Sequence, residues 1–101
     1  MITYNVTNEN ETIKEITVIG HANYKPKGED IICAAASMAT FMTANAIKYL
    51  KLEHLIQLEI NDGYFKIKQI THDEIVNGLL KNLDYTMRDL IRQYPSYILK
   101  N

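Results

Sequence analysis

The sequence is poor in several features that mark large classes of protein. It has one cysteine and no tryptophan, and its 11 basic and 12 acidic residues leave a formal net charge of −1. One cysteine cannot form an internal disulfide, and the N-terminus does not have a basic segment followed by an apolar run, so we expect a cytoplasmic protein. The balanced charge provides no electrostatic footprint for nonspecific binding to nucleic acid or to a membrane surface.

Long hydrophobic runs are also missing. The uninterrupted apolar stretches are only a few residues long, whereas a helix that crosses a bilayer needs about 20 apolar residues. We therefore expect no membrane span. A chain of 101 residues with 47% hydrophobic content can bury one core but has no room for a second, so residues 1–101 should form a single domain.

Four segments have the composition of β-strands. Residues 2–7 alternate apolar and polar side chains, and residues 13–19 are rich in β-branched side chains. Residues 55–61 and 64–70 flank an Asn-Asp-Gly sequence that favours a tight turn. Alternation and turn residues of this kind predict two β-hairpins.

Two segments have the spacing of α-helices. The first runs from about residue 30 to Leu50, and the second starts near residues 71–73 and ends before Pro95. The apolar stripe expected to face the core in the first helix is Ile31, Ala35, Met38, Met42, Ala46 and Leu50. The stripe of the second helix is Val76, Leu80, Leu83, Met87, Leu90 and Tyr94. A stripe containing Met38 and Met42 also suits an adaptable binding surface, but helical spacing favours the core.

This order of elements predicts an α+β fold of the type ββαββα. Each helix has one apolar stripe to bury, and an antiparallel sheet has one face available for it. We therefore expect two helices packed on one face of a mostly antiparallel four-stranded sheet.

Cys33 is the most informative residue of the chain. It lies twelve residues after His21, where a loop is expected to turn into a helix. The unpaired N–H groups at a helix N-terminus stabilise a thiolate, and a nearby imidazole would act as its base. The alternative is structural: Cys33 would be a small core side chain on an alanine-rich helix, and His21 would cap a carbonyl or face water.

Two polar residues near Cys33 have competing interpretations. Asp30 suits an N-cap of the helix, and its carboxylate would alternatively orient His21; we favour the cap. Ser37 lies one turn after Cys33, where its hydroxyl would contact the site or bond back to a helix carbonyl; we favour the second.

The residues around Cys33 resemble the signature of a known family, the ribosomal-processing cysteine proteases called Prp. The residues that carry the resemblance are Gly20, His21, Ala22, Gly28, Asp30, Ile31, Ile32, Cys33, Ala34, Ala35 and Ser37. The signature covers only residues 20–37, and the rest of the chain is similar in length and in the order of elements. The resemblance implies that His21 and Cys33 form the catalytic pair, with Gly20, Ala34 and Ser37 supporting the site.

Residues 23–29 contain Pro26 and Gly28, which disfavour regular structure and predict a loop that covers the site as a flap. Tyr24, Lys25 and Lys27 are expected to be solvated loop residues; in the functional alternative they and Gly28 help to hold a substrate peptide. Flaps of the family are richer in glycine, and proline narrows backbone freedom. A large gating motion is therefore less expected here.

The resemblance also implies a substrate. Members of the family are thiol endopeptidases that remove the N-terminal extension of a large-subunit ribosomal protein during ribosome biogenesis. The extension is expected to be an extended hydrophobic-aromatic segment, cut before a small residue. The resemblance further implies a homodimer, for which a sheet face or edge offers surface.

No cofactor, direct nucleic-acid contact or metal is expected. His54 and His72 occur singly, and their spacing from Cys33 does not match a zinc site. Two alternatives to the protease stay open at this stage. The first is a noncatalytic ribosome-associated module that binds a peptide, with Cys33 in the core. The second is a redox protein that uses a single thiol.

Overall fold

The computed structural model describes the backbone of residues 1–20 and 27–100 and the side chains of residues 1–20 and 31–100. The elements in chain order are β1 (Ile2–Glu9), β2 (Thr12–Ile19), α1 (Lys27–Tyr49), a 3-10 helix η1 (Glu53–Leu55), β3 (Ile56–Asn61), β4 (Tyr64–Gln69), α2 (Glu74–Gln93) and β5 (Ile98–Lys100).

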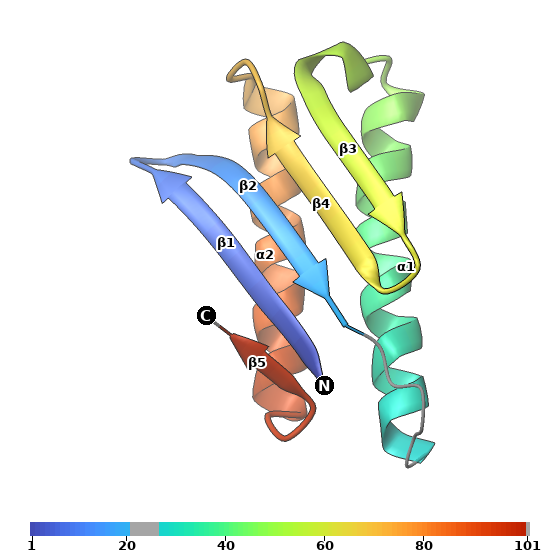
Figure 1. The fold of residues 1–101 in the computed structure, drawn as a ribbon. Coiled ribbons are helices and arrows are strands. Elements are labelled where there is room, and N and C mark those ends of the chain that lie inside the picture. Colours follow the sequence, from blue (N-terminus) through green and yellow to red (C-terminus); the bar gives the residue numbers. More distant parts are fainter. Residues whose placement is uncertain (21–26, 101) are drawn as a thin grey trace.

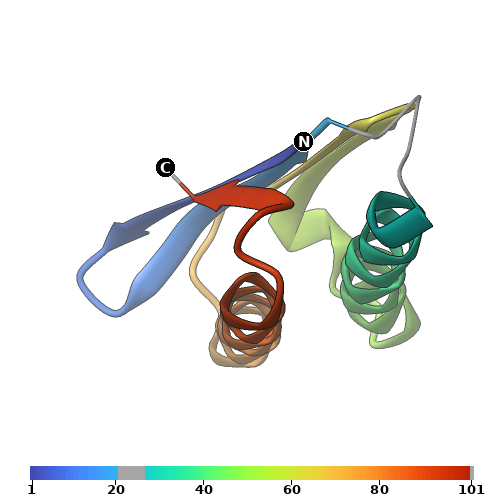
Figure 2. The same cartoon turned by 90° about the horizontal axis from the view of Figure 1, so that it is seen from below.

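The strands form one mixed sheet in the order β3-β4-β2-β1-β5. The pairs β1–β2, β2–β4 and β3–β4 are antiparallel, and β5 runs parallel to β1. Both helices lie side by side against one face of the sheet (Figures 1 and 2), and the opposite face is open. The predicted α+β class with two helices on one face is therefore confirmed.

The strand count differs from the prediction because β5 is a fifth strand. It has only three residues, and Ile98 pairs with Ile2 at the edge of the sheet. A three-residue strand after Pro95 is too short to show alternation. β5 can pair with β1 because the end of α2 brings the chain back to the edge of the sheet next to β1.

The core face of α2 was predicted correctly except at its C-terminal end. Val76, Leu80, Leu83 and Met87 are all buried. Leu90 is only partly buried, and Tyr94 is exposed and follows the last helical residue. The Asp73 carboxylate caps the helix by accepting the N–H groups of Ile75 and Val76, each at 3.0 Å, which sets the start of α2 at the predicted position.

The core face of α1 was predicted wrongly. Ile31, Ala35, Met38, Met42 and Leu50 are exposed, and Ala46 is only partly buried. The side chains of α1 that are buried instead are Ile32, Ala36, Thr40, Thr43, Ala44 and Ile47.

The composition of α1 explains this error. Residues 31–47 carry no charged side chain, so spacing alone did not distinguish a core face from a surface face. Thr40 and Thr43 donate their hydroxyls to the carbonyls of Ser37 and Ala39, each at 2.9 Å. Because these bonds satisfy the hydroxyls inside the helix, the threonines can be buried while methionines stay exposed.

The same composition makes α1 long and apolar enough to cross a membrane when only length and hydropathy are considered. The segment Ile31–Tyr49 has a mean hydropathy of 1.3, and 33% of it is buried in the fold. The sequence prediction considered only uninterrupted runs and missed this property. In the structure Ile32, Ala44 and Ile47 belong to the core, so α1 serves as a core helix of this domain.

Hydrogen bonds of polar side chains link α2 to the first hairpin. The Asn77 side chain accepts the N–H of Ile13 and donates to the carbonyl of Glu11, each at 2.9 Å. The hydroxyl of Tyr4 donates to the Asp84 carboxylate at 2.6 Å. Burial is the main reason that the pKa of Tyr4 is raised above its ordinary value, and the bond to Asp84 adds to it. Tyr4 therefore stays protonated and donates this bond at neutral pH.

Candidate active site

A cavity of about 280 Å³ lies where α1 passes the ends of the central strands. Cys33, Ser37 and Phe41 line it from α1, one turn apart from each other. Val18 and Gly20 line it from the end of β2, and residues 60–65 line it from the β3–β4 hairpin. Cys33 is partly buried, so its thiol lies at a site that is shaped by the protein and still open to a ligand.

Cys33 lies further inside α1 than the sequence predicted. The helix begins at Lys27, which makes Asp30 its fourth residue and places Cys33 in the second turn. The predicted N-cap role of Asp30 is therefore wrong, because a cap residue precedes the first helical residue. The helix starts earlier because Lys27 and Glu29 are good helix formers and one glycine does not prevent a helix.

This position changes the electrostatic argument for Cys33. Only the first four N–H groups of a helix lack intrahelical partners, and the helix-dipole effect falls off within the first turn. The N–H of Cys33 lies beyond these four and is committed to the helix. The groups that stabilise a thiolate or an oxyanion must therefore come mainly from other parts of the cavity.

Gly20 has a backbone role at the edge of the cavity. Its φ is +109°, and an added Cβ would collide with the carbonyl oxygen of Met1. Its N–H donates to the carbonyl of Gly63 at 2.8 Å. Only glycine accepts this conformation and this close approach, so Gly20 sets how the chain leaves β2 immediately before His21.

The two other residues predicted to support the site differ from each other. Ser37 lines the cavity together with Cys33, which agrees with the alternative of contact with the site and not with the favoured bond of its hydroxyl to a helix carbonyl. Ala34 is exposed and does not line it. Ala34 follows Cys33 by about 100° around the helix, which turns it away from the cavity.

The remaining predicted site residues are only partly covered by the structure. His21, Tyr24 and Lys25 lie outside the described residues, so the pairing of His21 with Cys33 stays a prediction. Lys27 and Gly28 are in the first turn of α1. The predicted flap over residues 23–29 is therefore wrong in its last three residues, which are helical.

Sequence reasoning missed the contribution of the β3–β4 hairpin. Asp62, Tyr64 and Phe65 line the cavity although they are about 30 residues from Cys33 in the chain. Their pattern indicated a turn and a strand, and nothing in it indicated a site. They reach the cavity because β4 pairs with β2, with Tyr64 opposite Ile19.

Among the side chains of residues 1–20 and 31–100, no group of three or more His, Cys, Asp or Glu could hold a metal ion. His72 lies on the surface, where its Nδ1 bonds with the Thr12 hydroxyl and its Nε2 with the Glu74 carboxylate, each at 3.0 Å. The candidate chemistry of the described site is therefore that of a thiol beside a cavity lined by polar and apolar groups.

Comparison with known proteins supports a protease. The family model for the cysteine protease Prp matches residues 1–99. The ribosomal processing cysteine proteases Prp of two Staphylococcus aureus strains, Mu50 and NCTC 8325, are each 30% identical to this chain over 104 residues. These alignments cover 100% of this chain and 98% of each relative.

Solved structures agree with the sequence comparison. The fold is similar to that of the essential ribosomal processing protease Prp from S. aureus in complex with a substrate peptide. The TM-score is 0.89 and the identity 26%, over 100% of this chain and 98% of the other. The same S. aureus protease with a covalently linked product peptide has a TM-score of 0.82 and an identity of 25%, with the same coverage.

A third solved structure shows the same fold at lower identity. It is a protein from Streptococcus mutans, with a TM-score of 0.76 and 22% identity over 100% of this chain and 92% of the other. The family match covers almost the whole chain and includes the cysteine beside the cavity. The chain therefore belongs to the Prp family of cysteine proteases, which are hydrolases acting on peptide bonds.

Proposed function

We propose that this enzyme removes the N-terminal extension of a large-subunit ribosomal protein in the cytoplasm, with Cys33 as nucleophile and His21 as base. The observation that carries the proposal is the partly buried thiol of Cys33 at the wall of the cavity. A structural cysteine of the alanine-rich helix would instead be enclosed by the core.

The proposed reaction has two stages. His21 takes the proton of the Cys33 thiol, and the sulfur attacks the carbonyl carbon of the scissile bond. The imidazolium then gives that proton to the leaving amine, which departs and leaves a thioester on Cys33. In the second stage His21 takes a proton from water, the hydroxide attacks the thioester, and the proton returns to the sulfur as the extension leaves as a carboxylic acid.

The cavity suits a peptide with apolar side chains. Val18, Phe41 and Phe65 are among its apolar lining residues, and Ser37 and the polar turn after β3 add polar groups to its wall. Apolar walls with a few polar groups are typical of sites that bind a ligand and orient it. The S. aureus relative, whose solved structures contain a substrate peptide and a covalently linked product peptide, supports a peptide ligand for this cavity.

The noncatalytic module was the alternative to this reading. In that alternative Cys33 would be a core residue with no access to a ligand. The partial exposure of Cys33 at the cavity favours the catalytic role. The membership in a family of peptidases favours it as well.

The test is cleavage of the large-subunit ribosomal protein that carries an N-terminal extension, from the same organism. Mass spectrometry after incubation with the wild type should show one new N-terminus. The Cys33→Ala and His21→Ala variants should leave the protein intact while keeping the far-ultraviolet circular dichroism of the wild type. Cleavage by folded Cys33→Ala would exclude the proposed nucleophile, and no cleavage by the wild type would exclude this substrate.

A further inference from the structure

The two edges of the sheet differ in how well they are protected. β5 forms one edge with only three residues. β3 forms the other edge with six residues, contains no proline or glycine, and pairs with β4 without a register shift. Figure 1 shows β3 as the outermost strand beside β4, and no strand in the described part of the chain pairs with its outer side. Long edge strands without such interruptions can bind another extended chain.

The pairing with β4 decides which backbone groups of β3 point outward. In an antiparallel pair, residues that bond to the partner strand alternate with residues that point away from it. The N–H of Ile70 donates to the carbonyl of Leu55 at 2.9 Å, so the odd-numbered positions bond to β4 and the even-numbered ones point outward. The N–H of Ile56 is already used by the 3-10 helix η1. Leu58 and Ile60 therefore present N–H and C=O groups at the outer edge.

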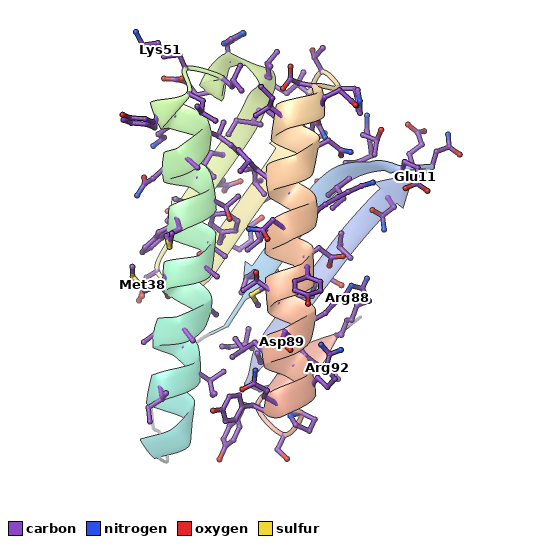
Figure 3. All side chains as sticks on the ribbon, turned by 180° about the vertical axis from the view of Figure 1, so that it is seen from behind. Glu11, Met38, Lys51, Arg88, Asp89 and Arg92 are labelled. Atoms are coloured by element: carbon purple, nitrogen blue, oxygen red, sulfur yellow. The ribbon has the colours of Figure 1, made fainter. Side chains whose placement is uncertain are left out.

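The side of β3 that faces α1 becomes more open toward the end of the strand. Ile56 is buried, Leu58 is partly buried, and Ile60 is 43% exposed. Phe41 of α1 lines the same cavity as Ile60 and is 42% exposed. Figure 3, seen from the helix side, shows α1 in front of the β3–β4 hairpin. A strand added beside β3 would cover apolar surface that α1 leaves open.

The other face of the same edge is polar. A hollow of about 490 Å³ lies over β3 and β4, and its lining residues are Gln57, Leu58, Glu59, Lys66 and Lys68. Successive side chains of a strand point to opposite faces of the sheet. A strand paired with β3 would therefore direct every second side chain toward charged groups and the intervening ones toward apolar groups.

The outer edge of β3 leads into the candidate active site. β3 runs toward the cavity, and Ile60 lines this cavity together with Cys33. A cavity of about 280 Å³ holds only a few residues of an extended peptide, which advances by about 3.3 Å per residue. A peptide with its scissile bond at Cys33 can therefore continue along β3. Strand addition of this kind binds the main chain of a peptide through hydrogen bonds.

We propose that the substrate peptide, on one side of its scissile bond, adds a strand to the outer edge of β3 by pairing with Leu58 and Ile60. The two faces of this edge select a segment in which apolar and polar side chains alternate. The inference rests on the proposed function and deepens it, because it names the surface and the pattern that recognise the substrate.

A second copy of this chain is the other occupant that an open strand edge suggests. The substrate peptide is the better occupant because the edge is continuous with the cavity that contains Cys33. The exposed apolar surface also lies at the cavity end of β3, at Ile60, and decreases away from it. An edge that served only to pair with a second copy would not require this gradient toward the thiol.

The first test is backbone amide exchange measured by NMR on the Cys33→Ala protein, which should not cleave its substrate. The probe is a synthetic peptide that spans the extension of the ribosomal protein and the first residues after the cut. At saturation, the amides of Leu58 and Ile60 should become hydrogen-bonded and exchange more slowly. Gln57 and Glu59, which already bond to β4, are the matched controls in the same strand. The slowing at Leu58 and Ile60 should exceed that of the controls by about 10-fold.

The outcomes of this test separate the inference from the proposed function. Chemical-shift changes at Ser37 and Phe41 without slower exchange at Leu58 and Ile60 would overturn the pairing and leave the proposed substrate intact. No change at either place would overturn both. Slow exchange at Leu58 and Ile60 without peptide, increasing with protein concentration, would assign the edge to a second copy and overturn the proposal.

The second test removes one outward N–H group. Proline is tolerated in an edge strand where the N–H would point away from the sheet. Leu58→Pro and Leu58→Ala both remove the side chain, but only the first removes the N–H. The kcat/KM for the peptide should be about 10-fold lower for Leu58→Pro than for Leu58→Ala. Alkylation of Cys33 by iodoacetamide does not use the edge and should be equally fast in both. Equal kcat/KM values would overturn the pairing.

Peptides with a single N-methyl group test the same hydrogen bonds on the unchanged protein. An N-methyl group removes one donor and blocks close approach of the two strands. Binding to the Cys33→Ala protein should weaken about 10-fold at every second position of the paired segment and change less at the positions between them. A loss without this alternation would overturn strand addition.

Discussion

The two helices of this protein cover the same face of one sheet and yet differ in almost every other respect. α2 buries large apolar residues such as Leu80, Leu83 and Met87 and exposes charged ones. α1 buries small and hydroxylated residues such as Ala36, Thr40 and Ala44 and exposes methionines. The candidate nucleophile is on α1, and the polar connections to the first hairpin are on α2.

This difference teaches that the two helices serve different requirements. The burial on α2 makes it a main source of stability, because buried aliphatic side chains contribute most to the free energy of folding. α1 presents a cavity wall on one side and an apolar surface on another, so its composition meets requirements other than those of the core. The predictions below compare the two helices, beginning with the largest effect.

The largest effect is expected from a substitution on α1, which should lower the cleavage rate and leave the stability of the fold nearly unchanged. Cys33→Ala should lower the rate of peptide cleavage by about 10⁴-fold or more, because the nucleophile is removed. The free energy of unfolding should change little, since Cys33 is only partly buried. Cleavage rates by mass spectrometry and urea unfolding would measure both. A Cys33→Ala enzyme that cleaves at the wild-type rate would place the nucleophile elsewhere.

The second prediction compares one methionine from each helix. Met87 is fully buried on α2, whereas Met38 on α1 is 59% exposed. Met87→Ala should lower the free energy of unfolding by about 2–5 kcal/mol, because it leaves a cavity in the core. Met38→Ala should change it by less than about 0.5 kcal/mol, because the side chain already meets solvent. Urea denaturation measures both free energies of unfolding. Equal losses in the two variants would contradict the buried position of Met87 and the exposed position of Met38.

The third prediction concerns the connection between α2 and the first hairpin. Asn77→Ala removes the acceptor for the N–H of Ile13 and the donor to the carbonyl of Glu11. Leaving these groups unpaired should lower the free energy of unfolding by about 2–3 kcal/mol. Asn82→Ala, at an exposed position of the same helix, is the control and should cost less than about 0.5 kcal/mol. Equal small losses would show that water replaces the Asn77 bonds.

The smallest effect is expected at Tyr4, which links β1 to α2 through Asp84. Tyr4→Phe should lower the free energy of unfolding at pH 7 by about 1–2 kcal/mol. Because the pKa of Tyr4 is raised in the folded state, its contribution is present below the unfolded pKa of about 10 and is lost as the pH rises above it. The difference between Tyr4→Phe and wild type should therefore shrink above about pH 10 in urea titrations. A constant difference would contradict this linkage.

Much of the fold followed from the sequence because its local signals agreed with each other. Alternation and a run of β-branched residues predicted the longer strands, the Asn-Asp-Gly turn predicted the β3–β4 hairpin, and Asp73 and Pro95 marked the two ends of α2. β5 was missed because three residues carry too little pattern. The start of α1 was misplaced because residues 27–30 contain no strong start signal apart from Asp30, and α1 begins before that residue.

The candidate site was only partly predictable. The signature around Cys33 pointed to the family, and Cys33, its predicted nucleophile, lines the cavity together with Gly20 and Ser37. The opposite wall, which includes Asp62 and Phe65, was not predictable because strand pairing across the sheet brings it there. The pairing of His21 with Cys33 stays a prediction, since His21 lies outside the described residues.

The sequence by itself determined the α+β class, the family and the core face of α2. These depend on signals within a few residues of each other, namely periodicity, caps, turns and a short signature. Only the tertiary structure decided which face of α1 is buried, where the fifth strand pairs and what surrounds Cys33. The physical reason is that no charged side chain in residues 31–47 marks a solvent-facing side of α1. Which side is buried therefore depends on how α1 packs against the sheet and α2.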